Sequence, residues 1–259
     1  MMTVNALFRQ RLISRHPLMG LFVKTASHQV IEVLEHSQLD FLIIDAEHAP
    51  FDRNVLDVML LAARAANLPA IVRIPEPTEA AVLAPLDMGA AGIMIPHVQT
   101  AEQAVVAVGY ARYGGRRGFS NSPRAGFYGV RPIAMHLEAA RAETSIIAMI
   151  EDNAAIDNLE AIAAVDGIDA LFLGRVDLAV TLAQSDVSHP EIEAAVQRVY
   201  AAARRTSKPL GALAGNAAAI TALMAEGVGY FVLGTDQGLL RGAATDVAAA
   251  AKAAAGLGR

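Results

Sequence analysis

The sequence contains no cysteine, and only three of its 259 residues are lysines, at positions 24, 208 and 252. The absence of cysteine excludes disulfide bonds, thiolate metal sites and cysteine nucleophiles, and it fits a reducing compartment. The scarcity of lysine leaves few candidates for an enzyme that forms a Schiff base with its substrate.

The chain also lacks basic runs and long uninterrupted apolar segments. Its net charge is −5, which does not favour a nucleic-acid or anionic-membrane partner. The apolar stretch 210–225 is interrupted by Gly215 and Asn216, and it is shorter than the roughly 20 residues that span a membrane. The first twenty residues contain no apolar core of a signal peptide. We therefore expect a cytoplasmic protein with no nucleic-acid or membrane partner.

Short apolar runs typical of buried parallel strands alternate along the chain with segments of helical apolar spacing. The predicted strands are residues 19–23, 41–44, 69–72, 92–95, 145–150, 168–173, 210–214 and 230–233. The predicted helices are residues 27–36, 51–66, 78–88, 100–110, 131–142, 153–163, 190–205, 217–225 and an alanine-rich segment from 239 onward. A glycine-rich, basic loop is expected at 113–126.

Eight strands that alternate with helices predict an α/β fold, a (β/α)8 TIM barrel, which typically takes about 250 residues. We expect one domain over residues 1–259, with a short N-terminal helix within 1–18 at the bottom of the barrel. The alternative is an open doubly wound sheet. Against it, no Gly-x-Gly-x-x-Gly motif follows the first strand and no phosphate-binding loop is present.

Ionisable residues follow the predicted strands at their carboxyl ends, where active sites of parallel α/β folds form. They are Lys24, Asp45, Glu47, His48, Arg73, His97, Glu151 and Asp177. The amino ends of the strands show Ser37, Gln38, Asn67, Ala91 and Ser145. Because these are not charged, we expect no comparable cluster there.

Three chemical roles are open to these residues, each with a structural alternative. Glu151 and Asp177 follow consecutive strands and suit a hard divalent ion, but each could instead cap a helix or pair with arginine. His48 is a candidate general base or a surface histidine. Arg73 can donate to a carboxylate or an enolate, or form a salt bridge with a neighbouring carboxylate.

The motifs Asp-x-Glu-His and Gly-x-x-Asp-Leu, in this order, resemble those of metal-dependent pyruvate aldolases of the HpcH/HpaI aldolase/citrate lyase family. The segments that carry the resemblance are 41–51 (FLIIDAEHAPF), 71–75 (IVRIP), 86–96 (LDMGAAGIMIP), 149–151 (MIE) and 165–178 (VDGIDALFLGRVDL). The resemblance extends over roughly residues 17–240.

The resemblance implies a role for each matching residue. His48 corresponds to the catalytic base, Asp87 to the acid that raises its basicity, and Arg73 to the residue that stabilises the enolate. Glu151 and Asp177 correspond to the metal ligands. The implied substrate-binding residues are Arg73, Met149, Gly174, Val176 and Asp177. Arg124 resembles a position near the substrate.

Two positions depart from the family pattern. Met149 stands where the family often has glutamine, and methionine cannot donate the hydrogen bond that glutamine makes to substrate. Arg175 stands where the family often has proline. Both changes bear on the identity of the substrate rather than on the metal or the base.

The implied activity is reversible cleavage of a 4-hydroxy-2-oxo acid to pyruvate and an aldehyde, in the catabolism of aromatic or sugar acids. The expected cofactor is Mg²⁺ or Mn²⁺, with Co²⁺ or Zn²⁺ possible, and the expected partner is a second copy of the chain in a hexamer or trimer. The alternatives are a Schiff-base aldolase that uses Lys24, an acyl-CoA ester lyase of the citrate lyase β type, and a non-catalytic small-molecule binder.

Overall fold

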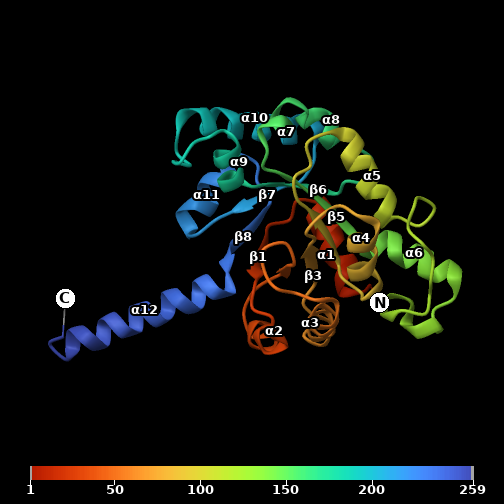
Figure 1. The fold of residues 1–259 in the computed structure, drawn as a ribbon, viewed down its shortest axis with the longest axis horizontal. Coiled ribbons are helices and arrows are strands. Elements are labelled where there is room, and N and C mark those ends of the chain that lie inside the picture. Colours follow the sequence, from red (N-terminus) through yellow and green to blue (C-terminus); the bar gives the residue numbers. More distant parts are fainter. Residues whose placement is uncertain (1, 258–259) are drawn as a thin grey trace.

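The computed structural model describes residues 2–257, and its eight parallel strands form a closed barrel in chain order. The strands are β1 (Leu18–Val23), β2 (Phe41–Asp45), β3 (Ala70–Arg73), β4 (Gly92–Ile95), β5 (Ser145–Ile150), β6 (Ala170–Leu173), β7 (Leu210–Leu213) and β8 (Tyr230–Thr235). Each strand pairs with the next, and β8 pairs with β1. The predicted TIM barrel is confirmed (Figure 1).

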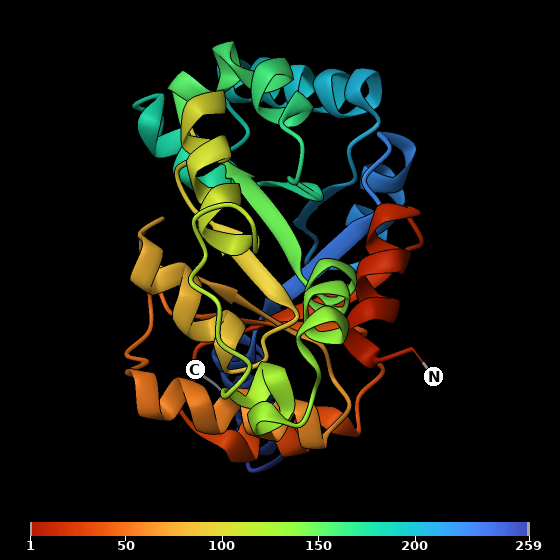
Figure 2. The same cartoon turned by 90° about the vertical axis from the view of Figure 1, so that its right-hand side faces the viewer.

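Helices surround the barrel (Figure 2). They are α1 (Val4–Ile13), α2 (His28–Glu35), α3 (Arg53–Ala65), α4 (Glu79–Asp87), α5 (Ala101–Ala111), η1 (Arg124–Gly129), α6 (Ile133–Glu143), α7 (Asn153–Asp157), α8 (Leu159–Ala164), α9 (Arg175–Thr181), α10 (Pro190–Thr206), α11 (Ala217–Ala225) and α12 (Asp236–Ala254). Thr3, Asp52, Thr78 and Thr100 cap the amino ends of α1, α3, α4 and α5 through their side chains. Such caps satisfy backbone N–H groups that have no partner within the helix.

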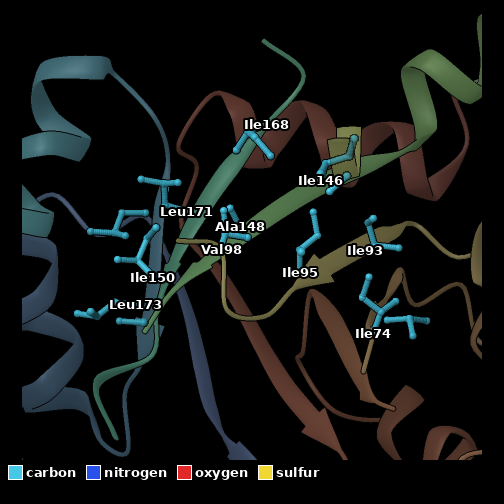
Figure 3. Packing of buried hydrophobic residues seen from close by; sticks show 14 of the residues in the cluster. Ile74, Ile93, Ile95, Val98, Ile146, Ala148, Ile150, Ile168, Leu171 and Leu173 are labelled. Atoms are coloured by element: carbon cyan, nitrogen blue, oxygen red, sulfur yellow. The ribbon is translucent and has the colours of Figure 1, made fainter. Parts of the chain in front are cut away.

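Two buried apolar clusters follow from the alternation of side chains along each strand. The inner cluster fills the barrel and includes Phe41, Phe172 and Tyr230. The outer cluster lies between the strands and the helices, and Ile93 and Ile146 belong to it (Figure 3). Both faces of each strand are therefore covered, which explains the continuous apolar runs in the sequence.

Helix α1 closes the amino end of the barrel. Phe8 and Leu12 are buried and belong to the inner cluster. The ring of Phe8 lies 5.2 Å from that of Phe41 between centroids. The N-terminal helix is therefore at the bottom of the barrel, as expected.

Two local predictions need correction, and a third is refined. The helix predicted at 153–163 is two helices, α7 and α8, separated at Asn158, whose side-chain amide donates to the carbonyls of Ala154 and Gln99. The sequence analysis predicts no helix directly after the sixth strand, whereas the structure has helix α9 there. The glycine-rich loop is irregular, as expected, and ends in η1, where Phe127 and Tyr128 adopt positive φ values.

Helix α12 leaves the barrel and extends away from it (Figure 1). Asp236 is its only buried residue among those described, and Leu240 and Val247 are exposed. Apart from Asp236, the described residues of this helix are therefore not buried against their own chain. Among residues 2–257, no helix combines the length and apolar character needed to cross a membrane.

Candidate active site

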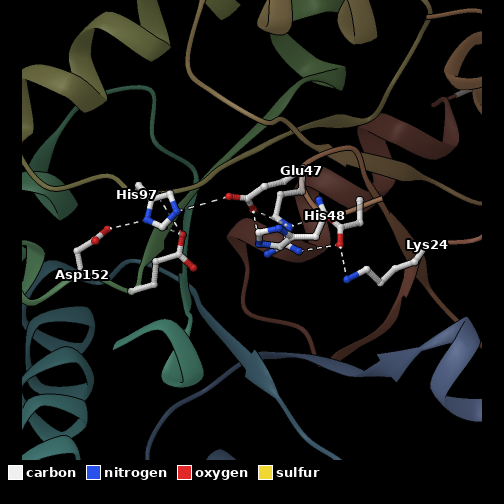
Figure 4. Close-up of polar contacts among 8 residues, drawn as sticks. Lys24, Glu47, His48, His97 and Asp152 are labelled. Carbon is white, nitrogen blue, oxygen red and sulfur yellow. Dashed lines mark hydrogen bonds and ion pairs between the residues drawn. The ribbon is translucent and has the colours of Figure 1, made fainter. Parts of the chain in front are cut away.

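The ionisable side chains at the carboxyl ends of β1 to β5 gather at one mouth of the barrel. Figure 4 shows Lys24, Glu47, His48, His97 and Asp152 around this mouth. The closed parallel barrel brings them together, because all its strands end on the same side. The predicted clustering of these strand-exit residues is what the structure shows.

Asp45 and Arg73 form a buried pair at the ends of β2 and β3. Arg73 donates from Nε to Oδ1 of Asp45 at 2.9 Å and from Nη2 to Oδ2 at 2.7 Å. Burial alone would raise the pKa of Asp45, but the hydrogen bonds and charge of Arg73 outweigh it and hold the pKa below its usual range. Lys24 Nζ lies 3.2 Å from Oδ2 of the same carboxylate. These pairings fix the Arg73 guanidinium in a single orientation.

Glu47 lies between three basic groups. Its Oε2 atom is 3.2 Å from Arg73 Nε and 3.6 Å from His48 Nε2, and its Oε1 atom is 3.5 Å from His97 Nε2. Oε2 is buried and has no hydrogen bond of good geometry among residues 2–257. The Glu47 carboxylate therefore interacts with both histidines and with Arg73 through longer ion-pair contacts rather than through short hydrogen bonds. The side chain of His48 is 53% exposed, so it is accessible to a substrate.

Glu151 is a buried carboxylate, and among residues 2–257 His97 is the basic side chain in close contact with it. It is 1% exposed, and its Oε1 accepts a hydrogen bond from the backbone N–H of His97 at 2.9 Å. Burial raises the pKa of Glu151 to about 7, and the nearby negative charges of Asp177 and Glu47 add to the effect. A cation placed here would relieve this cost, because it favours the ionised carboxylate.

Gly174 and helix α9 place Asp177 beside Glu151. A Cβ atom at residue 174 would lie 2.6 Å from Oε2 of Glu151, so only glycine allows the chain to pass so close. Asp177 follows in the first turn of α9. Two carboxylates of this kind suit a hard divalent ion. Among residues 2–257, no group of three or more His, Asp or Glu side chains is arranged to hold a metal, so further ligands would be water or substrate oxygens.

His97 follows β4 in a left-handed backbone conformation, with φ 54°. Its Nδ1 atom is 3.0 Å from Oδ2 of Asp152 and 3.7 Å from Oε1 of Glu151. Burial lowers the pKa of His97, but the hydrogen bond to Asp152 and the surrounding carboxylates outweigh burial and raise it overall.

Not every predicted residue lies at this mouth. Asp87 ends α4, before β4, and pairs with Arg117 at 2.8 Å. Arg124 pairs with Asp57 and donates to the carbonyl of Met88 at 2.8 Å. Asp87 lies just before β4, and Arg124 lies in a loop that contacts the end of α4. Both residues are therefore at the amino end of the barrel. Within one chain they do not approach His48, which follows β2.

Apart from Arg73 on β3, the substrate-binding residues implied by the resemblance lie on β5 and at the start of α9. Met149 is on β5 and belongs to the inner cluster. The side chain of Val176 is exposed, whereas Gly174 is buried and donates its N–H to the carbonyl of Ile150 at 3.0 Å. Arg175 points to Glu193, with 2.7 Å between Nη2 and Oε2. It therefore does not contact the ionisable cluster.

Sequence reasoning missed two carboxylates at the mouth. Asp152 follows Glu151 directly and could have been found at the same strand exit. Asp236 accepts hydrogen bonds from the backbone N–H groups of Lys24 and Thr25 at 2.9 and 3.0 Å. Asp236 directly follows β8, but its contact with Lys24 and Thr25 can be predicted only if β8 is known to pair with β1.

The fold and site define a (β/α)8-barrel enzyme with ionisable side chains gathered at the carboxyl ends of its strands. The sequence matches the HpcH/HpaI aldolase/citrate lyase family over residues 18–243, so the chain belongs to this family. It is a class II aldolase, a lyase of carbon–carbon bonds.

Individual relatives cover nearly the whole chain. A 5-keto-4-deoxy-D-glucarate aldolase from Klebsiella pneumoniae is 35% identical over 95% of this chain and 96% of its own. The crystal structure of a HpcH/HpaI aldolase/citrate lyase family protein from Burkholderia cenocepacia superposes with a TM-score of 0.88 at 34% identity, covering 93% of this chain and 97% of that one. A citrate synthase superposes with a TM-score of 0.85 at 29% identity, covering 95% and 98%.

Proposed function

We propose that the chain cleaves a 4-hydroxy-2-oxo acid to pyruvate and an aldehyde, and catalyses the reverse aldol addition. The observation that carries this proposal is the buried Glu151 carboxylate, beside Asp177, on the same mouth as Arg73 and His48. The names of the relatives support a sugar-acid substrate. The aldehyde partner is the part of the reaction that they leave open.

Glu151 and Asp177 would hold a divalent cation, in keeping with the metal dependence of the family. Two carboxylates and no sulfur ligand fit Mg²⁺ or Mn²⁺ best, while Co²⁺ and Zn²⁺ are further candidates. When bound, such an ion acts as a Lewis acid on the 2-keto group of the substrate. The protein side chains supply the remaining steps.

His48 takes the proton of the C4 hydroxyl group in the cleavage direction. The C3–C4 bond then breaks, its electron pair moves into the pyruvate fragment, and the aldehyde leaves. Arg73 uses Nε and Nη2 for Asp45, so its Nη1 hydrogens remain to stabilise the enolate oxygen. A donor held in place before the reaction starts can contribute several kcal/mol. His48 can return its proton to C3 to give pyruvate.

The first experiment follows the methyl protons of pyruvate by NMR in D₂O, with Mg²⁺ or Mn²⁺ and again with EDTA. Metal-dependent loss of the methyl signal is expected, because enolisation exchanges these protons. Exchange that persists in EDTA would instead indicate a Schiff base at Lys24. If neither methyl-proton exchange nor an aldol reaction occurs with any metal, the result would favour the acyl-CoA ester lyase or the non-catalytic small-molecule binder instead.

The variant His48→Ala should lower turnover by about 10²-fold or more, because it removes the base. His16→Ala is a matched control, since His16 is exposed and lies before β1, at the other end of the barrel. Near-normal turnover in His48→Ala would exclude the proposed role. Asp87 stays a predicted partner of His48 that one chain does not supply.

The assembly we propose is a homo-oligomer, a hexamer or trimer. Its support is α12, which exposes Leu240 and Val247 and makes no buried contact beyond Asp236 among the described residues. Light scattering coupled to size exclusion would measure the mass in solution. A monomer at micromolar concentration would contradict the proposal.

A further inference from the structure

The backbone at His97 is held in a left-handed conformation that residues other than glycine rarely adopt. Its φ is 54°, and such values tend to occur where a residue is oriented for function. The backbone N–H donates to Glu151, and Nδ1 of the ring faces Asp152 at 3.0 Å. The main chain and Asp152 together fix the direction of the ring.

The opposite edge of the ring has no close partner. Among residues 2–257, the nearest acidic oxygen to Nε2 is Oε1 of Glu47 at 3.5 Å, which is longer than the ~2.9 Å of an ordinary N–H···O bond. The side chain is 52% exposed. Figure 4 shows the ring between Glu47 on one side and Asp152 on the other. A polar atom of a ligand can therefore bind at Nε2 without breaking a strong contact.

His97 also lines a cavity that adjoins the ionisable cluster. This cavity of about 330 Å³ lies between the loops that follow β3 and β4, and its walls include Pro75, Pro77, Pro96 and Gln99. Proline fixes φ and removes a backbone donor, so these walls are stiff and mostly apolar. The volume is large enough for the short carbon chain of a small aldehyde.

We propose that His97 is a specificity residue, which hydrogen-bonds through Nε2 to an oxygen substituent of the aldehyde, while the carbon chain enters the cavity beside it. The inference rests on the proposed aldolase function. Arg73, Glu151 and Asp177 serve the pyruvate half, and His97 lies next to this set, in the loop that follows β4. The site then selects hydroxylated aldehydes over plain alkyl aldehydes through a contact that pyruvate does not use.

The test compares glycolaldehyde with acetaldehyde, which differ by one hydroxyl group, as acceptors for pyruvate. His97→Gly removes the side chain but tolerates the positive φ, and it keeps the N–H that Glu151 accepts. We expect kcat/KM for glycolaldehyde to fall by about tenfold, the effect of one lost hydrogen bond, mainly through KM. The value for acetaldehyde and the exchange of pyruvate methyl protons should change less than twofold.

His97→Asn should restore part of the preference for glycolaldehyde, because asparagine also tolerates positive φ and offers a polar side chain. His16→Asn, at the other end of the barrel, is the matched control. Equal losses for both aldehydes together with slower methyl exchange would show that His97 only supports Glu151. Unchanged kinetics would overturn the proposal as well. Absence of methyl exchange and aldol addition in the wild type would instead contradict the proposed function itself.

Discussion

The two ends of the barrel differ in how closely their carboxylates are paired with basic side chains. At the amino end, Asp169 accepts hydrogen bonds from Arg9, Arg112 and the backbone N–H of Ile146, at 2.6 to 3.3 Å. Arg117 pairs there with Asp87 at 2.8 Å. Asp169 and Asp87 therefore each have a close basic partner, and the contacts of Asp169 connect α1 and the residue after α5 to the strands.

At the carboxyl end, several carboxylates share the same basic groups. Arg73 and Lys24 both contact Asp45, and Arg73 also lies 3.2 Å from Glu47. Among residues 2–257, Glu151 and Asp152 have only the ring of His97 as a basic group within 4 Å. Closely paired charges at one end stabilise the fold, whereas incompletely paired charges at the other leave binding capacity for a cation and a substrate. The comparison predicts that substitutions at the two ends affect different properties.

The largest effect on stability is expected from Asp169→Ala. The change leaves the guanidinium of Arg112, which is 20% exposed, without its carboxylate partner. Removing one partner of a fully buried pair costs about 3–5 kcal/mol, which is the upper end of the loss expected here. Chemical denaturation should show this loss, while kcat of the folded protein stays within a few-fold. Asp166→Ala, at an exposed position three residues away, should change stability by only ~0.5 kcal/mol. A large loss of kcat with intact stability would contradict the division between the two ends.

Sequence reasoning could predict the carboxyl end better than the amino end, for a physical reason. Residues of the candidate site such as Asp45 and Glu151 lie at the carboxyl ends of apolar strands, so the local pattern reveals them. The expectation of no charged cluster at the amino ends is wrong, since Asp169 and Arg9 pair there. The sequence does not reveal this pair, because the two residues are 160 positions apart. Only the closed barrel brings them together, and no local pattern contains that information.

Within the site, the sequence likewise predicts the features that depend on strand direction but not the contacts that depend on packing. The clustering of Glu47, His48, Arg73 and His97 followed from strand direction alone. The pairing of Arg73 with Asp45 was foreseen only as an alternative, since spacing does not specify which rim charges meet. The cavity beside His97 depends on how two loops pack, and these loops have no periodic pattern to interpret.

An intermediate effect is expected from Glu151→Gln in the metal-free protein. The pKa of Glu151 is about 7 in the folded protein, above its ordinary 4.5. Stability from the protonated carboxyl is therefore fully present below about pH 4.5 and is lost as pH rises through 7. In EDTA, wild type and variant should unfold alike at pH 5, and at pH 8 the variant should be more stable by up to about 3 kcal/mol.

Differential scanning calorimetry at several pH values would measure this difference. Added Mg²⁺ or Mn²⁺ should reverse it at pH 8, because a ligand that binds only the folded wild type stabilises that protein. Asp152→Asn, one residue along the chain, is a control that keeps the Glu151 carboxyl group. If the difference between wild type and Glu151→Gln does not depend on pH, the buried charge at this position is not the source of the effect.

The smallest effect is expected from Lys24→Met, which tests whether the lysine belongs to the chemistry or to the charge network. Lys24 Nζ lies 3.2 Å from Asp45, whose main partner is Arg73. Because Arg73 keeps Asp45 paired, loss of the lysine should lower kcat/KM less than about tenfold, as for a contact worth ~1 kcal/mol. Borohydride with pyruvate should trap no adduct in the wild type. Complete loss of activity in Lys24→Met, together with a trapped adduct, would assign Schiff-base chemistry to this end of the barrel and would leave the Glu151–Asp177 pair without the function proposed for it.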